Sequence, residues 1–210
     1  MRYAIMQQGV SRSFPPGDSF LDGASADGEV VVCLGAPHQP DPARRAILIE
    51  LGSECLGVHT GEGYGDEGSN VLGFARYRNG DDPPSQLIEL VVQPSSDPGA
   101  IEAARELFEA AGFEVAVCAD QAGRIVDRLV RPVYNAALRL LDEKLASAEA
   151  LDTTCRLGLG YRDGPIERVM RGGLAHHHDV TKALFEVYGA AAYAPARRAV
   201  VARQRREKDA

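Results

Sequence analysis

Residues 124–165 read RIVDRLVRPVYNAALRLLDEKLASAEALDTTCRLGLGYRDGP, and the spacing of their apolar side chains decides the fold of the last third of the chain. Pro132 lies inside this stretch and is expected to kink a helix or to lie in its early turns. We expect a helix over residues 125–145, because apolar residues recur there every three or four positions, at Leu129, Val133, Ala136, Ala137, Leu140 and Leu141.

Shorter helices are expected after this one. Ser147 can cap the first of them and Gly158 can end it, and Pro165 suits the first turn of the next. No strand pattern is present after residue 120, which predicts an all-α domain. The expected segments are residues 149–157, a short helix that starts at Asp163 or Gly164, and residues 179–188 and 196–206.

The chain before residue 120 carries strand patterns instead. Residues 86–93 and 113–118 flank a helical segment that Asp97 can cap and Gly112 can end. This strand–helix–strand order predicts a parallel strand pair. The other expected strands are residues 3–6, 29–35, 55–59 and 70–78, with residues 43–51 open to strand or helix and residues 7–28 expected to be loop.

Charge also divides the chain near residue 120. Residues 1–120 carry 7 Lys and Arg against 19 Asp and Glu, a balance of −12, whereas residues 121–210 carry 16 against 11, a balance of +5. We therefore expect two domains, residues 1–120 and 121–210. The basic tail from Arg203 is too short for a nucleic-acid arm, so no nucleic-acid partner is expected.

The composition excludes several other classes. No apolar run reaches the roughly 18 residues that span a bilayer, and the N-terminus has no signal-peptide pattern, so a cytoplasmic location without membrane association is expected. The cysteine spacings match no zinc pattern, which favours buried free thiols at Cys33, Cys55, Cys118 and Cys155.

The last third of the chain resembles the C-terminal helical domain of the 3-hydroxyacyl-CoA dehydrogenase family. That family has the pattern R-L-x-x-P-x-x-N-x-A followed by A-S-x-E-x-x-D-x-x-x-x-L-G-x-G-Y-x-x-G-P. The matching positions are Arg128, Leu129, Pro132, Asn135, Ala137, Ala146, Ser147, Glu149, Asp152, Leu157, Gly158, Gly160, Tyr161, Gly164 and Pro165.

The resemblance implies the fold and the partners. It implies a truncated Rossmann-like α/β domain with a mixed or parallel sheet over residues 1–120, followed by the helical domain over residues 121–210. In the family, the helical domain forms the dimer interface and one wall of the acyl-CoA cleft. The resemblance therefore implies a homodimer through residues 121–210 and an acyl-CoA ligand.

The catalytic residues of the family are mostly replaced in this chain. The family oxidises a 3-hydroxyl with a His base and a carboxylate partner, helped by an Asn and a Ser. Ala75 matches the position of the His and Glu89 that of the carboxylate. Asp127 stands at the position of the Asn, and Gly61 loosely matches the Ser.

The cofactor site is also degenerate. A dinucleotide fold needs a G-x-G-x-x-G loop after its first strand so that the pyrophosphate can approach a helix N-terminus. Residues 7–17 read QQGVSRSFPPG and lack this loop. No bound cofactor is therefore expected, and NAD is implied only if the chain is an active dehydrogenase.

Three residues remain as site candidates. His59 either replaces the missing base or is a loop histidine without a catalytic role. Glu89 either keeps a vestige of the catalytic role or pairs with Arg76 or Arg78 on the neighbouring strand. Asp127 either lines the site or pairs along its helix, with Arg124, Arg128 or Arg131 as the possible partners.

The run His176–His178 is expected to be solvent-exposed on the connection into a helix, and it makes a poor metal site because consecutive side chains diverge. The leading hypothesis is a 3-hydroxyacyl-CoA-dehydrogenase-like protein with little or no dehydrogenase activity, which binds an acyl-CoA or an active partner. The alternatives are an active NAD-dependent dehydrogenase with a rearranged base and a ligand-free dimerisation module.

Overall fold

The computed structural model describes residues 1–208, which form two compact units. The first unit comprises residues Met1–Arg78 and Pro84–Arg124. Of the described residues, the second comprises 125–208 together with the short segment Asn79–Pro83. Within residues 1–208, no helix is both long enough and apolar enough to cross a membrane.

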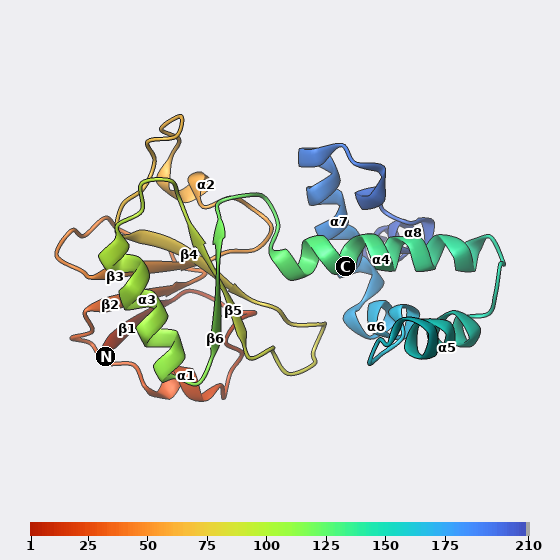
Figure 1. Ribbon diagram of the computed structural model, residues 1–210, viewed down its shortest axis with the longest axis horizontal. Coiled ribbons are helices and arrows are strands. Elements are labelled where there is room, and N and C mark those ends of the chain that lie inside the picture. The colour runs from red at the N-terminus through yellow and green to blue at the C-terminus, as the bar shows by residue number, and fades with distance from the viewer. Residues whose placement is uncertain (209–210) are drawn as a thin grey trace. The chain divides into compact units, whose positions relative to one another are not determined.

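The first unit is built on a single six-stranded sheet (Figure 1). The strands follow one another across the sheet in the order of the sequence, and all neighbours are parallel except β4 and β5, which are antiparallel. The expected mixed sheet followed by helices is therefore confirmed. The strands are β1 (Tyr3–Gln7), β2 (Val30–Leu34), β3 (Ala46–Glu50), β4 (Val71–Arg76), β5 (Leu87–Val92) and β6 (Glu114–Ala119).

Helix α3 (Pro98–Ala110) covers one face of this sheet (Figure 1). Asp97 caps it by accepting a hydrogen bond from the Gly99 amide, as expected from the sequence. The segment expected to be loop contains a short helix, α1 (Ser19–Asp22), and sends aromatic side chains into the same core. Phe14 and Phe20 from this segment stack on each other with ring centroids 4.3 Å apart.

The second face of the sheet carries a smaller apolar cluster that includes Ile47, Ile49 and Leu56. The strand expected at residues 55–59 is wrong, because this segment forms the short helix α2 (Gly57–Thr60). The reason is a distant partner: the Asp120 carboxylate accepts hydrogen bonds from the amides of Leu56 (2.6 Å) and Gly57 (2.8 Å). A five-residue apolar run does not encode that contact.

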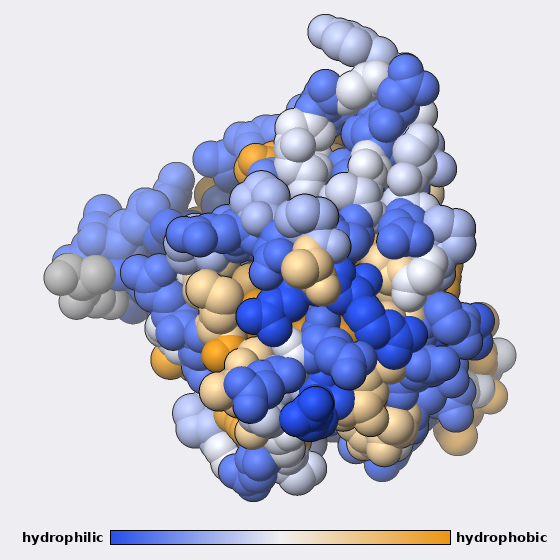
Figure 2. Space-filling model, turned by 90° about the vertical axis from the view of Figure 1, so that its left-hand side faces the viewer, coloured by the Kyte–Doolittle hydropathy of each residue, from blue (hydrophilic) through white to orange (hydrophobic). Residues whose placement is uncertain are grey.

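The surface of the first unit is largely polar. Figure 2 shows a face dominated by hydrophilic residues, with apolar ones scattered between them. This surface agrees with the excess of acidic residues in the first 120 positions. Net charge of this kind favours solubility and does not determine the fold.

The second unit is helical, and most of its helices begin and end close to the expected residues. Pro132 lies inside α4, as expected. Helix α5 ends at Leu159, two residues beyond the expected end at Leu157, because Gly160 rather than Gly158 adopts the left-handed conformation (φ 72°) that closes the helix. The helices are α4 (Ile125–Asp142), α5 (Ala148–Leu159), α6 (Pro165–Gly172), α7 (Leu174–Tyr188), η1 (Ala191–Tyr193) and α8 (Arg197–Lys208).

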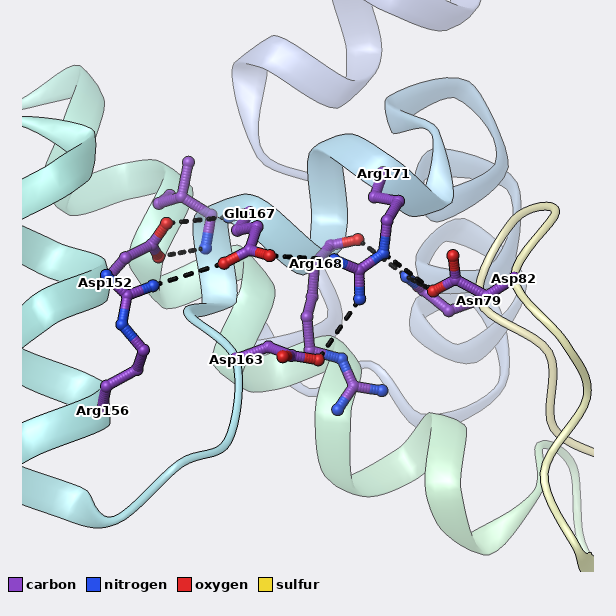
Figure 3. Close-up of polar contacts among 9 residues, drawn as sticks. Asn79, Asp82, Asp152, Arg156, Asp163, Glu167, Arg168 and Arg171 are labelled. Carbon is purple, nitrogen blue, oxygen red and sulfur yellow. Dashed lines mark hydrogen bonds and ion pairs between the residues drawn. The ribbon is translucent and has the colours of Figure 1, made fainter.

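The corner between α5 and α6 is held by Asp152 (Figure 3). Its carboxylate accepts hydrogen bonds from the amides of Ile166 (2.8 Å) and Glu167 (3.0 Å) at the start of α6. The acid therefore satisfies two of the N–H groups that a helix start leaves without partners. A Cβ at Gly164 would lie 2.1 Å from the Asp152 Cγ, so this position needs glycine.

The segment Asn79–Pro83 contacts α6 through hydrogen bonds and an ion pair (Figure 3). The Asn79 side-chain amide donates to the Arg168 carbonyl (3.1 Å), and Arg171 pairs with Asp82 (2.8 Å). Arg171 also pairs with Asp163 (3.2 Å), so one guanidinium joins two segments distant in sequence. The hydrogen bond from Arg171, followed by that from Asn79, lowers the pKa of Asp82 below its usual value.

Substituting Gly164 tests the corner. We expect Gly164→Ala to lower the free energy of unfolding by about 1–3 kcal/mol, because the added methyl group overlaps the Asp152 carboxyl. The matched control is Gly158→Ala inside α5, where an added Cβ meets nothing within 4 Å. That control should be neutral or stabilise the helix by up to about 1 kcal/mol. Urea unfolding followed by circular dichroism measures both, and equal effects would contradict the account.

Candidate functional site

The antiparallel pairing of β4 with β5 places Ala75 directly opposite Glu89. Side chains at directly opposed positions have Cβ atoms about 4.5–5.5 Å apart. Both residues are buried, with Ala75 8% and Glu89 1% exposed. An acid is therefore held beside a methyl group, and nothing at position 75 can take or give a proton.

Arg76 is not the partner of Glu89. Because successive side chains of a strand point to opposite faces, Arg76 lies on the face that carries α3. There it pairs with Asp18, and its guanidinium lies 4.6 Å from the centre of the Phe113 ring. The alternative in which Glu89 pairs with Arg76 is therefore wrong.

Polar side chains meet where β5 and β6 end. The Gln93 side-chain amide donates to Thr60 Oγ1 (3.0 Å) and to Asp120 Oδ2 (3.3 Å). Asp120 also caps α2, so its carboxylate joins the end of the sheet to that helix. The sequence analysis missed Asp120 and Gln93, because neither belongs to a motif.

His59 lies on α2 in the same unit. The carboxylate that it contacts is Glu54, with 3.5 Å between His59 Nε2 and Glu54 Oε1, and about a third of its side chain is exposed. Gly61 ends α2 in a left-handed conformation (φ 88°). The structure therefore brings His59 to Glu54 rather than to Glu89.

The two thiols nearest to these residues are not activated nucleophiles. Burial raises the pKa of Cys118 above its usual value, and Glu89 and Asp120 add to this effect while Arg124 opposes it. Burial also raises the pKa of Cys55. A reactive cysteine needs a lowered pKa, so nucleophilic thiol chemistry is not supported here.

Asp127 lies in the second unit, where it pairs with Arg131 (2.7 Å) one turn further along α4. Of the three partners considered from the sequence, Arg131 is the one that forms the ion pair. This pair is largely buried, because the Arg131 side chain is only 4% and that of Asp127 22% exposed. Losing one partner of such a pair costs more than at an exposed pair, since it leaves a buried charge.

A buried histidine continues this network. His177 Nδ1 lies 3.4 Å from Arg131 Nη1, and His177 Nε2 lies 2.9 Å from Asn135 Oδ1. The neutral ring fits both contacts when Nε2 donates to Asn135 and Nδ1 accepts from Arg131. Burial, followed by the charge of Arg131, lowers the pKa of His177 to about 3.

The expected solvent-exposed run at His176–His178 is therefore wrong, because His177 is fully buried and its two neighbours are partly buried. Helix α7 begins at Leu174, five residues before the expected Asp179, so the run lies within a helix. On a helix, consecutive residues point in directions about 100° apart, so His177 can face the core while its neighbours do not. The residues that the structure describes hold no cluster of three or more potential metal ligands.

Comparison with known proteins identifies the helical unit. Residues 123–209 match the family model described as "3-hydroxyacyl-CoA dehydrogenase, C-terminal domain". The chain is 35% identical over 100 residues to the mitochondrial hydroxyacyl-coenzyme A dehydrogenase of Homo sapiens, and 31% identical over 113 residues to a 3-hydroxybutyryl-CoA dehydrogenase of Bradyrhizobium diazoefficiens. These matches cover 48% and 54% of this chain but only 31% and 39% of the relatives.

Solved structures with a similar fold include FadB2 of M. tuberculosis, with a TM-score of 0.69 and 20% identity over 83% of this chain and 65% of that one. Another is the (S)-3-hydroxybutyryl-CoA dehydrogenase PaaH1 of Ralstonia eutropha, with a TM-score of 0.67 and 19% identity over 87% of this chain and 66% of that one. The resemblance to the 3-hydroxyacyl-CoA dehydrogenase family is confirmed by these matches. The chain spans about a third of the length of the curated relatives that it matches.

The buried histidine makes stability depend on pH. The pKa of His177 is lower in the folded state, about 3, than in the unfolded chain, about 6.5. The contribution of His177 to the free energy of unfolding is therefore complete above about pH 6.5, and it is lost as the pH falls from there toward 3. The loss is at most about 1.4 kcal/mol per pH unit, or about 2 kcal/mol by pH 5.

We expect His177→Gln to be less stable than the wild type at about pH 7.5, because it disrupts the contacts with Arg131 and Asn135. The difference in free energy of unfolding between wild type and variant should shrink by up to about 2 kcal/mol at about pH 5, since the variant has no imidazole to protonate. Urea unfolding at both pH values measures the gap. A gap that stays constant would show that His177 is not held neutral.

Proposed function

We propose that this chain is a 3-hydroxyacyl-CoA-dehydrogenase-like protein with little or no dehydrogenase activity of its own, and that it binds an acyl-CoA or an active partner. The observation that carries the proposal is the register that sets Ala75 against the buried Glu89. In the family resemblance these two positions correspond to the catalytic base and its carboxylate. The carboxylate is kept and the base is gone.

The missing base has a large kinetic cost. Oxidation of a 3-hydroxyl requires removal of the hydroxyl proton while hydride leaves the carbon. A positioned general base contributes about 10²–10⁴ in rate. His59 is a poor replacement, because its contact is with Glu54 and it does not pair with Glu89.

The topology of the sheet also disfavours dinucleotide binding. In doubly wound sheets the cofactor lies where the strand order reverses. The described sheet runs from β1 to β6 without a reversal, so it has no such point. The helix that follows β1 is only four residues long, and residues 8–17 before it lack the glycine fingerprint.

Ligand binding separates the three hypotheses. We expect the protein to bind acetoacetyl-CoA, to bind NADH weakly or not at all, and not to reduce NAD with 3-hydroxybutyryl-CoA. Ala75→His alone should not restore activity, because no cofactor would be held beside it. Calorimetry and absorbance of NADH measure these outcomes.

Turnover above about 1 per second, the low end of ordinary enzymes, would instead favour the active dehydrogenase with a rearranged base, and His59 would be the first residue to replace. If the protein binds neither acetoacetyl-CoA nor NADH, the result would favour the ligand-free dimerisation module. We place the function in the cytoplasm, in keeping with the four cysteines that carry no disulfide.

A homodimer through residues 121–210 is part of the proposal. Ten of the sixteen large apolar side chains exposed in the described residues lie in the second unit, among them Leu129 (67%), Leu157 (84%) and Met170 (55%). An apolar groove of about 540 Å³ runs beside α8 and is lined by Leu141, Ile166 and Val201. Apolar surface on this scale favours burial against a second copy.

Light scattering tests the dimer. The expected mass is about twice the 22.5 kDa of one chain at micromolar concentration. Met170→Glu should shift the protein toward the monomer, because it places a charge on an apolar surface. Val58→Glu in the first unit is the control, since Val58 is 72% exposed. A wild-type monomer at this concentration would refute the proposal.

A further inference from the structure

Strand β1 forms one edge of the sheet in the first unit. It stands first in the strand order and pairs with β2 on one side (Figure 1). Among residues 1–208, no strand pairs with its other side. The backbone groups on that outer side are therefore left for partners other than the sheet itself.

The backbone of Ile5 points to this outer side. In a strand, the backbone groups of successive residues point to opposite edges. The amide of Gln8, directly after β1, donates to the Leu34 carbonyl of β2 (2.9 Å), so the even-numbered residues face β2. The Tyr3 carbonyl instead accepts from the amide of Ser25 (2.7 Å), which lies outside the sheet. Ile5 therefore offers an N–H and a C=O at the open edge.

Strand β1 lacks the features that usually keep an edge strand from pairing with another chain. Charged side chains, prolines and bulges are the common ones. The strand reads YAIMQ, without a charge or a proline, and it follows β2 in an unbroken register. Its five residues are an ordinary length for a strand. By contrast β6, the other edge, begins with the exposed Glu114.

A cavity of about 260 Å³ lies beside this edge. The strands contribute Met6, Val31, Cys33 and Ile47 to its lining, and the last three belong to the apolar cluster on the face opposite α3. Met6, on β1 itself, is 44% exposed. A strand added beside β1 would lie about 4.8 Å away, so one of its side chains on this face would contact Met6 at the cavity.

The cavity suits an apolar side chain. Two charged residues, Asp41 and Arg44, line it together with the strands, and they pair with each other at 3.2 Å. Their charges compensate each other, so neither is left for a charged group of a partner. The remaining strand side chains around the cavity are apolar.

The charge of the first part of the chain selects the kind of partner. Residues 1–120 carry a balance of −12. Pairing β1 with β1 of a second copy would bring two such units together, and like charges repel. A basic segment would be attracted instead, because complementary charges steer and favour association. The edge therefore suits a basic partner better than a second copy of this chain.

We propose that β1 is the docking edge for an extended, basic segment of a partner protein. The segment adds to the six-stranded sheet as a further strand, with its backbone bonded to Ile5 and an apolar side chain against Met6. In this mode of recognition, backbone hydrogen bonds supply affinity and a pocket for alternate side chains supplies selectivity. The surface goes beyond the proposed function, because it requires neither a thioester nor a dehydrogenase.

Hydrogen exchange followed by nuclear magnetic resonance tests the open edge in the protein alone. The Ile5 amide should exchange at least about tenfold faster than those of Ala4 and Met6, which face β2. An Ile5 amide as protected as its neighbours would show that the edge is already covered. Protection that grows with protein concentration would show that a second copy covers it. Either result overturns the proposal.

A synthetic peptide then takes the place of the partner segment. The probe alternates leucine and threonine and carries a pair of lysines at each end, so it is basic and apolar on one face when extended. We expect it to shift the resonances of Ile5 and Met6 and to slow exchange of the Ile5 amide. A peptide that leaves both residues unchanged at millimolar concentration would overturn the proposal.

Two control peptides separate the backbone contribution from the charge contribution. The first is methylated on the amide nitrogens that would face β1, and it should bind at least about tenfold more weakly. The second carries glutamates in place of the lysines and should also bind more weakly, most clearly at low salt. Equal binding of the methylated peptide would rule out strand addition, and equal binding of the acidic peptide would rule out a basic partner.

Variants of β1 complete the test. Ile5→Pro removes the outward N–H, and proline is tolerated where an edge strand faces solvent. It should bind the basic peptide at least about tenfold more weakly, whereas Ile5→Val should bind as the wild type does. Met6→Lys should weaken binding by placing a cation beside the peptide, and Val10→Lys, at a residue that is 81% exposed, is its matched control.

The variants and the peptides decide the question independently. If Ile5→Pro does not fold, the methylated peptide still tests the backbone pairing in the wild-type protein. Wild-type affinity in both Ile5→Pro and Met6→Lys would place the peptide elsewhere and overturn the proposal. Equal losses in Met6→Lys and Val10→Lys would do the same, because they would show a general effect of charge.

Discussion

The antiparallel register of β4 and β5 is the constraint on which the candidate site depends. Because side chains alternate along a strand, a slip of one residue would turn Glu89 to the α3 face and Leu90 away from the core. The register holds because Phe74, Ile88 and Leu90 are all fully buried on that face. The aromatic core thus fixes the place of an acid on the opposite face, where it lies beside Ala75.

The helical unit uses polar groups in a different way. Asp152 closes the corner between α5 and α6, and His177 joins Arg131 to Asn135 inside the unit. Each of these polar groups is satisfied by a partner distant in the sequence. Buried networks of this kind specify one arrangement because a half-satisfied network is costly. The family motif residues Asp152 and Gly164 thereby have a structural role that requires no catalysis.

The two units therefore differ in how they relate to the chemistry of the family. The second unit keeps the family pattern and the contacts that support it. The first unit sets Glu89 opposite Ala75 on two antiparallel strands, and its strand order does not reverse.

Short-range patterns in the sequence determined most of the elements. The period of the apolar residues predicted α4, the turn chemistry of Ser147 and Pro165 predicted the starts of α5 and α6, and Asp97 marked the start of α3. These features depend on residues within a few positions of one another, so local spacing is enough to reveal them. The match of Ala75 and Glu89 also came from the sequence, through the family resemblance.

The tertiary structure alone decided the contacts between distant residues. The segment expected to be a strand forms α2 because its first amides donate to the carboxylate of Asp120, more than sixty positions away in the sequence. His177 became a buried hydrogen-bonding residue only because α7 begins early and faces Arg131 and Asn135. Burial and partner choice are set by packing over the whole chain, and local sequence carries no record of them.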